Sequence, residues 1–451
     1  MKNLKQYLII LLVILLFGGG WWFLSTCYEG EKPVLKLSET IDTIGRKKII
    51  DIIATDKKRG LRKISVTIFQ DKKKHVLYSV DYPQKGTKEE TLHVVVNPGS
   101  LKLHDGEARI NISAVDYSLR KNSTTLNIKV MIDTTPPHIY LLSSAHNISP
   151  GGSCVTIYNV PEAVVKNGVN VGNDYFPGYP INLEGRSCYI AYFAFPIDAK
   201  KKDVRAEIIV RDKAGNESLK SIPCYIRNRK FRTDTINITD TFLKRKMPEF
   251  QMIDTSLREA TLLQTFQYVN KQMRYDNFKT IQLICKKSEQ KKLWQGPFLR
   301  MKNAATTARF GDKRTYYYKG KKVSKSIHMG IDLASTRHAE IVVSNSGVVV
   351  FTGYLGIYGD TIIIDHGLGL FSLYGHLGMI KVKEGQMVTK GELIGNSDTS
   401  GLAGGDHLHF SILIGGKFVD PREWWDPHWI KDNVERKINY QKSEARSQKS
   451  E

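Results

Sequence analysis

Two short motifs in the last third of the chain carry side chains that can bind a metal ion and move protons. His328-Met-Gly-Ile-Asp332 places a nitrogen and an oxygen ligand four residues apart, with Gly330 permitting a bend between them. His407-Leu-His409 begins a stretch that reads as a strand, on which residues i and i+2 face the same side. A further imidazole, His376, lies between the two motifs in a Tyr-Gly-His-Leu sequence.

These residue types match the needs of a catalytic zinc site. Such a site uses three nitrogen or oxygen ligands and keeps one position open for water, whose pKa falls to about 7. His328, Asp332 and one of the paired histidines could supply the ligands. The chain contains no His-Glu-x-x-His, so the usual glutamate base is absent. His376 and His407 are suitable substitutes for moving the proton, although strand geometry alone allows either member of the pair to be the ligand.

The combined motif set resembles that of the lysostaphin-like zinc endopeptidases, metallopeptidase family twenty-three. The resemblance covers about residues 293–425. A small departure is Gly378, where a serine is common. Supporting sequences also agree with the family pattern: Arg309-Phe-Gly, Gly347, Val388-Thr-Lys-Gly391-Glu-Leu-Ile-Gly395 and Thr399-Ser-Gly401.

The resemblance implies a small, mostly antiparallel β-domain with Zn²⁺ in a groove. It implies that His328, Asp332 and His409 hold the zinc, while His376 and His407 assist the water and the tetrahedral intermediate.

Members of this family cut short peptide bridges in bacterial peptidoglycan, so the expected function is hydrolysis of peptide cross-links during cell-wall remodelling. The peptidoglycan peptide stems are then the substrate, and a D,D-type cross-link is favoured over a polyglycine bridge. The alternative is a catalytically silent wall-binding activator of another peptidoglycan hydrolase. The complete ligand set argues against that alternative.

The N-terminus predicts a membrane anchor. Residues 7–24 form an uncharged apolar run, about 27 Å long as a helix, which is enough to span a bilayer core. Lys2 and Lys5 precede the run, so residues 1–6 are expected to be a cytoplasmic tip. No alanine occurs before residue 30, which argues against a cleaved signal peptide. We therefore expect a single-pass protein of the inner, or cytoplasmic, membrane with its bulk in the periplasm.

Composition is consistent with that location. The net charge of +22 suits an anionic partner, and an extracytoplasmic chain is expected to meet wall polymer or lipid and no nucleic acid. The five cysteines form no CxxC pair, which makes a thiolate zinc site improbable. Two of Cys154, Cys188 and Cys224 could form a disulfide in an oxidising compartment.

The remaining sequence predicts a multidomain, mainly β protein. Short β-branched strands before Asp133-Thr-Thr-Pro-Pro, and a similar strand and turn pattern after it, resemble tandem immunoglobulin-like modules. Such modules could act as spacers or dock envelope proteins, and the helical segment or a sandwich could cover the groove. The expected divisions are a transmembrane anchor (7–24), two immunoglobulin-like β-domains (33–135 and 136–230), a basic helical segment (239–292), a zinc endopeptidase domain (293–428) and a charged tail (429–451).

Overall fold

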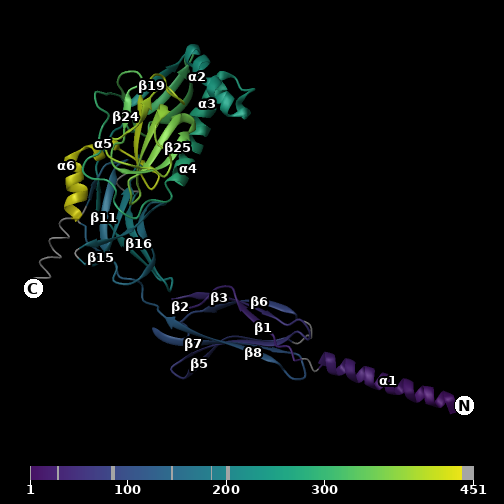
Figure 1. Ribbon diagram of the computed structural model, residues 1–451. Helices are drawn as coiled ribbons and strands as arrows, with labels where there is room; N and C mark the ends of the chain where they lie inside the picture. Colours follow the sequence, from purple (N-terminus) through teal and green to yellow (C-terminus); the bar gives the residue numbers. More distant parts are fainter. Residues whose placement is uncertain are drawn as a thin grey trace, which may run out of the picture. The chain divides into compact units, whose positions relative to one another are not determined.

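The computed structural model describes residues 2–27, 30–82, 87–143, 146–183, 185–199 and 204–438. The chain is mainly β and divides into two compact units (Figure 1). The first unit contains the residues up to Pro137 with two short later segments, 163–165 and 211–217, and the second contains the rest of the chain from His138 onward. The domain boundaries expected from the sequence remain predictions.

The N-terminal helix α1 spans Lys2–Cys27 and includes the apolar run at residues 7–24. Its described side chains are exposed, as Trp21 and Trp22 illustrate. Among the described residues, no helix combines the length and apolar character required to cross a bilayer. The predicted membrane anchor is therefore not confirmed.

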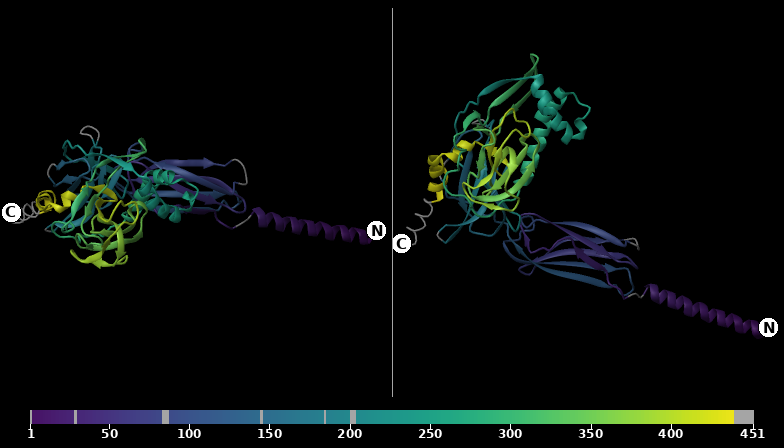
Figure 2. Two further views of the ribbon diagram at one scale, coloured as in Figure 1. Left: turned by 90° about the horizontal axis from the view of Figure 1, so that it is seen from above. Right: turned by 45° about the horizontal axis from the view of Figure 1, so that its top comes forward.

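Two sheets with a common core follow the helix, and they form two facing layers in Figure 2. Their strands alternate buried aliphatic and exposed polar residues, because successive side chains point to opposite faces. The arrangement is that of a β-sandwich, whereas the immunoglobulin-like assignment is not confirmed. One sheet has the order β1-β3-β6 and the other β2-β8-β7-β4-β5: β1 (Val34–Leu37), β2 (Thr43–Ile44), β3 (Lys48–Thr55), β4 (Leu61–Gln70), β5 (Lys73–Asp81), β6 (Glu89–Val96), β7 (Gly106–Asp116) and β8 (Ser123–Ile132).

Short strands continue between residues 138 and 228. They form two four-stranded sheets, β14-β15-β11-β9 and β13-β12-β16-β17, and a parallel pair, β10-β18. Cys154, Cys188 and Cys224 are free thiols, so the disulfide expected between two of them is not found. The strands are β9 (Tyr140–Leu141), β10 (His146–Ile148), β11 (Ser153–Asn159), β12 (Val164–Val171), β13 (Asp174–Pro177), β14 (Tyr179–Leu183), β15 (Arg186–Ala194), β16 (Ala206–Asp212), β17 (Glu217–Ser221) and β18 (Cys224–Ile226).

The expected helical segment is present. After β19 (Thr233–Ile238), the Thr239 side chain caps helix α2 (Asp240–Ile253) by accepting a hydrogen bond from the Phe242 amide. A capping box starts the next helix. The remaining helical elements are η1 (Thr255–Leu257), α3 (Leu262–Tyr268), the π-helical turn η2 (Val269–Met273) and α4 (Arg274–Ile284).

A large sheet occupies the last third of the chain, with helix α4 running beside it (Figure 1). Its central strands are buried on both faces, and every strand pair in this sheet is antiparallel, as predicted. Its main path is β20-β23-β30-β27-β26-β25-β28, with β24, β29 and β31 attached. The bounds are β20 (Ala305–Ala308), β23 (Ile331–Ala334), β24 (Glu340–Val342), β25 (Gly347–Tyr354), β26 (Asp360–Asp365), β27 (Leu370–Ile380), β28 (Met387–Val388), β29 (Leu393–Ser397), β30 (Leu408–Ile414) and β31 (Lys417–Val419).

Two further strands, β21 (Lys313–Tyr318) and β22 (Lys321–Ile327), form a separate sheet with β19. A 3₁₀ turn, η3 (Gly356–Tyr358), connects β25 to β26. The chain then ends in α5 (Pro421–Trp425), α6 (Pro427–Ile430) and the π-helical turn η4 (Lys431–Glu435). Residues 439–451 of the expected tail lie outside the described part.

Candidate metal centre and active site

The ladder between β23 and β30 brings the expected metal ligands together. Asp332 on β23 is the register partner of His409 on β30, and His328 lies just before β23. One Asp332 carboxylate oxygen, Oδ1, is 2.9 Å from His328 Nε2 and 2.9 Å from His409 Nδ1. The two ring nitrogens are 3.0 Å apart. Three potential ligand atoms therefore converge on one point, and all three residues are buried.

Hydrogen bonds on the far sides of both rings leave the converging nitrogens free for a metal. His328 Nδ1 lies 3.1 Å from the Arg309 carbonyl and can only donate to it. His409 Nε2 lies 3.0 Å from the Ser411 hydroxyl, which itself donates to the Met329 carbonyl at 3.0 Å. Ser411 therefore accepts from His409. Such partners orient metal-binding histidines and fix their tautomers.

The electrostatics of this group favour an ionised Asp332 carboxylate beside a neutral His409 ring. Burial alone would raise the pKa of Asp332, but the neighbouring side chains of His328, His407 and His409 hold it well below its usual range. Arg314 adds an ion pair at 3.2 Å to the other carboxylate oxygen, Oδ2. Burial lowers the pKa of His409 to about 4, which keeps its ring neutral at physiological pH.

The three residues fit a zinc ion in both donor type and spacing. Zinc takes nitrogen and oxygen ligands at about 2.0–2.2 Å. Atoms about 3 Å apart, as here, can all lie at that distance from one central point. The outer hydrogen bonds complete the arrangement, since each ring has a partner for its second nitrogen.

A glycine between the first two ligands allows this close approach. A Cβ atom at Gly330 would lie 2.5 Å from the Ser411 hydroxyl and 2.6 Å from the His409 ring. The sequence suggested that Gly330 permits a bend. The structure gives a different reason, because the backbone passes directly against the His409 side chain.

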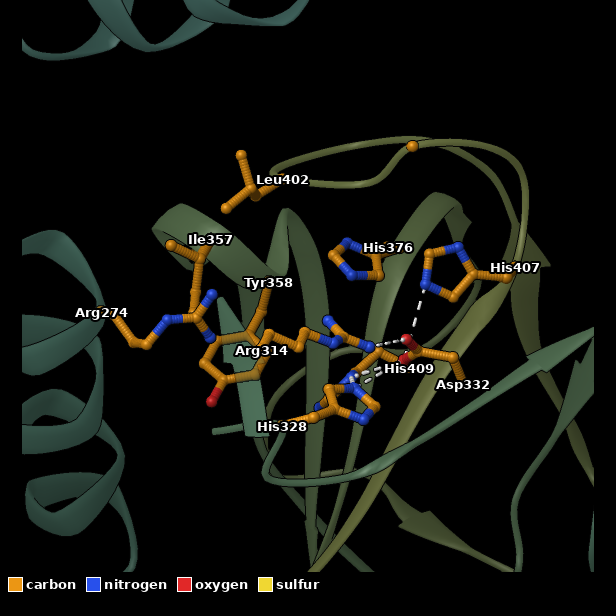
Figure 3. Close-up of a pocket in the computed structure, with 11 residues that line it drawn as sticks. Arg274, Arg314, His328, Asp332, Ile357, Tyr358, His376, Leu402, His407 and His409 are labelled. Atoms are coloured by element: carbon orange, nitrogen blue, oxygen red, sulfur yellow. Dashed lines mark hydrogen bonds and ion pairs between the residues drawn. The ribbon is translucent and has the colours of Figure 1, made fainter. Parts of the chain in front are cut away.

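Two further imidazoles lie beside the metal-binding group, as Figure 3 shows. His376 Nδ1 is 2.8 Å from the Ser400 carbonyl, and His407 Nδ1 is 2.8 Å from the Gly405 carbonyl. Each Nδ1 donates, which leaves each Nε2 as the atom able to accept a proton. The ring centres are 4.7 Å apart, and His407 Nε2 lies 3.6 Å from Asp332 Oδ1.

A change of strand partner turns His376 toward the site. Strand β27 pairs with β30 up to Gly375 and with β29 from Leu377 onward. The register with β26 also shifts at this point, as in a β-bulge. His376 lies at the junction with φ of 61°, a conformation that is unusual for a non-glycine residue and is often found at functional sites.

Helix α2 holds the loop that leads to His407, residues 398–407, which we call the rim loop. Lys246 Nζ donates to the Thr399 carbonyl at 2.8 Å and pairs with Glu249 at 2.7 Å. Glu249 accepts from the Gly401 amide at 3.1 Å. Lys246 is buried, so this lysine and its partners connect the helical segment firmly to the rim loop.

A cavity of about 120 Å³ lies over these residues. All five expected site residues line it, together with three polar residues that the sequence did not single out: Arg274, Arg314 and Tyr358. Burial raises the pKa of Tyr358 to about 12, and the nearby Arg274 charge opposes part of that rise. The hydroxyl of Tyr358 is therefore protonated at physiological pH.

The tyrosines of strand β21 pack against the helical segment. The Tyr316 ring is buried with its centre 5.4 Å from that of Phe266. Tyr318 donates to Asp240 at 2.6 Å, at the start of α2. Neither tyrosine lines the cavity. Arg314, on the same strand, does line the cavity.

Comparison with known proteins assigns the metal-binding region to a family. Residues 326–421 match Peptidase family M23. This segment is an M23 peptidase domain. DD-carboxypeptidase/endopeptidase Mpg of Neisseria meningitidis is 38% identical to the chain over 95 residues, which are 21% of this chain and 22% of Mpg.

Peptidoglycan DD-endopeptidase ShyA of Vibrio cholerae is 37% identical over 93 residues, again 21% of this chain and 22% of the relative. The chain thus spans about a fifth of the length of these curated relatives. The aligned stretches are about as long as the family match, and these relatives support the assignment of a peptidase domain.

Solved structures include two with wider but weaker similarity. A putative M23 peptidase from Pseudomonas aeruginosa aligns over 62% of this chain and 95% of its own, with 20% identity and a TM-score of 0.37. A zinc-containing peptidase from Vibrio cholerae aligns over 70% and 80%, with 15% identity and a TM-score of 0.26. Both TM-scores are too low to support an argument about this chain.

Proposed function

We propose that this protein is a zinc-dependent endopeptidase that hydrolyses peptide cross-links of bacterial peptidoglycan. The observation that carries the proposal is the convergence of His328, Asp332 and His409 within 3.0 Å of one another, beside the rings of His376 and His407. The named activities of the relatives of the M23 domain point to the same substrate class, and two of them are peptidoglycan DD-endopeptidases.

The residues divide into two groups in this proposal. His328, Asp332 and His409 hold Zn²⁺, which when bound supplies a Lewis acid and lowers the pKa of its water. His376 and His407 each present Nε2 toward the cavity, so a neutral ring can take a proton and a protonated ring can donate one. The carbonyls of Ser400 and Gly405 keep both rings in the tautomer that this role requires.

The rim loop and helix α2 orient the rings of His376 and His407. His376 and His407 both depend on this loop, through the Ser400 carbonyl and through the chain itself. Lys246 and Glu249 fix the loop from helix α2. Positioned proton-transfer groups contribute about 10²–10⁴-fold to rate, and their effect depends on such fixed geometry.

A catalytically silent activator is the alternative function. It would need no proton-transfer groups beside its metal ligands. The presence of both imidazoles, each with a defined tautomer, favours catalysis. Digestion of purified murein separates the two functions, with mass spectrometry of the released peptides identifying the broken bond.

The expected result is cleavage of peptide cross-links by the zinc-loaded wild type and none by His409→Ala. Intact murein after treatment with a zinc-loaded, folded wild type would overturn the proposal. Cleavage of the glycan strands in place of peptide bonds would do so too.

An extracytoplasmic location, with the chain held at the membrane by its N-terminus, remains a proposal that agrees with this substrate. It rests on the sequence of residues 1–31. Recovery of the full-length chain in the membrane fraction, with its bulk open to protease from the periplasmic side, is the expected result. A chain found free in the cytoplasm would contradict this proposal.

A further inference from the structure

A cationic side chain from outside the family-matched segment lines the active-site cavity. Arg274, the first residue of α4, reaches from that helix toward Ile357 and Tyr358, at the end of the cavity away from Asp332 and His407 (Figure 3). No carboxylate among the described residues forms an ion pair with it. Its partners there are two neutral acceptors on Asn270, the backbone carbonyl at 3.4 Å and the side-chain Oδ1 at 3.0 Å.

Those two hydrogen bonds orient the guanidinium and leave most of it free. Nε and one hydrogen of Nη2 are used, so three of the five N–H groups remain. The residue that holds it is itself fixed, since Asn270 is buried and donates to the Ser324 hydroxyl at 2.7 Å. A guanidinium fixed in this way can bind a carboxylate through two parallel hydrogen bonds.

The helix that carries Arg274 is attached to the wall of the cavity. Asn277 lies one turn further along α4, on the same face, and its Oδ1 accepts from the Ile357 amide at 2.9 Å. Gly356 allows this contact, because a Cβ there would lie 2.4 Å from the Asn277 side chain. Arg274 is thereby set at a fixed position relative to Tyr358, whose ring centre is 5.2 Å from that of His409.

The charges around the cavity favour an anion. The charged residues that line it are Arg274, Arg314 and Asp332, together with the histidines. Arg314 and Asp332 pair with each other, which leaves the charge of Arg274 uncompensated. A cavity with one sign of charge concentrates ligands of the opposite sign.

We propose that Arg274 binds a free carboxylate on a residue flanking the scissile bond, and so determines which peptides the enzyme accepts. The small cavity, about 120 Å³, requires the carboxylate to be close to the reacting amide. This inference rests on the proposed peptidase function, but binding can be tested apart from cleavage. Two carboxylates could fulfil the role: one on the residue that supplies the amine of the scissile bond, or the free C-terminus of the peptide.

The test measures binding of uncleavable peptides to the zinc-loaded full-length protein. In each peptide a ketomethylene link replaces the scissile amide, and either the amine-side carboxylate or the C-terminal carboxylate is amidated. We expect amidation of one of them to weaken binding to the wild type about 10- to 100-fold, the range for a charge-assisted hydrogen bond. The position that matters identifies the source of the carboxylate.

Two variants then assign the preference to Arg274. Arg274→Gln should bind the free and amidated forms equally, while Arg274→Lys should recover part of the preference. Asn270→Asp keeps the arginine in place but gives it a carboxylate partner, and should also abolish the preference. Zinc content should not change in any of the three, since none touches the metal-binding group.

Each outcome separates this inference from the proposed function. A wild type that cleaves murein yet binds all peptide forms equally overturns the role of Arg274 and leaves the peptidase function standing. A wild type that prefers the free carboxylate but does not cleave murein supports the role of Arg274 and overturns the peptidase function. A preference that persists in both Arg274→Gln and Asn270→Asp, or no peptide binding at all, also overturns the inference.

Discussion

The proposed active site contains two regions that are built in different ways. The floor, which consists of His328, Asp332 and His409, rests on a ladder of main-chain hydrogen bonds in which Asp332 and His409 are register partners. The rim loop, residues 398–407, has little regular pairing and depends on side chains from helix α2. The floor is therefore fixed by local strand geometry, and the rim loop by contacts between distant parts of the chain.

The difference suggests a division of labour. A metal site needs three ligand atoms at nearly constant distances, which a sheet interior provides. Proton-transfer groups must also reach a substrate. The two proposed here, His376 and His407, lie beside the rim loop and at its end. Loops placed on a rigid scaffold often carry functional residues for this reason. Changes in the floor should therefore remove the metal, while changes at the rim should impair turnover and leave the metal bound.

The largest effect is expected at the floor, from Asp332→Asn. This substitution preserves shape but removes the charged ligand and the ion pair with Arg314. Bound zinc should be lost, and cleavage should fall by more than about 10³-fold, since a catalytic metal supplies several kcal/mol of transition-state stabilisation. Metal analysis and murein digestion measure the two quantities. Full zinc content in this variant would contradict the role given to the floor.

The next largest effect is expected for the two imidazoles beside the rim loop. His376→Ala and His407→Ala should each lower the cleavage rate by about 10²–10⁴-fold, the usual contribution of a positioned proton-transfer group. Zinc content should remain that of the wild type, because neither residue is assigned to the floor. If either variant purified without metal, that histidine would have to be assigned to metal binding as well.

A smaller effect is expected where helix α2 holds the rim loop. Lys246→Met removes the hydrogen bond to Thr399 and the ion pair with Glu249. The cleavage rate should fall by about tenfold, the value of one buried charge-assisted hydrogen bond. Lys244→Met, at an exposed position of the same helix, is the matched control and should behave as the wild type. Equal rates for both variants would mean that α2 does not position the rim loop.

A change remote from both regions separates activity from stability. Glu423 is half-buried, with its pKa raised to about 8 mainly by desolvation of its carboxyl, and it accepts a hydrogen bond from the Ser153 amide. A carboxyl with a raised pKa in the folded state destabilises that state as pH rises from about 4.5 to about 8. The loss is at most about 1.4 kcal/mol for each pH unit in that window.

Thermal unfolding of Glu423→Gln against the wild type measures this effect. The variant should have the higher Tm at pH 8 and lose that advantage near pH 4.5, with little change in metal content at either pH. A wild-type Tm that rises between pH 5 and pH 8 by more than that of the variant would contradict the assignment.

The floor could be predicted from the sequence far better than the rim loop. His328 and Asp332 lie four residues apart, and His409 lies on a strand whose pattern is plain, so local spacing and family resemblance were sufficient. Arg274 was not predicted as a site residue. It belongs to no motif, and the other residues that line the cavity lie between positions 314 and 409. The contact between Lys246 and Thr399 joins residues 153 positions apart and has no local signal.

The same contrast holds for the fold. The short strands expected before Asp133 were confirmed, for example in β3, β4 and β7, because the alternation of buried and exposed positions can be read from neighbouring residues. The reason for Gly330 became clear only when strand β30 lay against it. Side-chain contacts between elements depend on tertiary packing, and periodicity within one element carries no information about them.

The most direct test of the account is a zinc titration of the chelator-stripped, full-length protein, with release of cross-link peptides from murein as the readout. The account predicts that cleavage rises with bound zinc and saturates at one ion per chain. His407→Ala should bind the same single ion without recovering the rate. Cleavage of peptide cross-links by the metal-free wild type would contradict the central claim that His328, Asp332 and His409 form a catalytic zinc site.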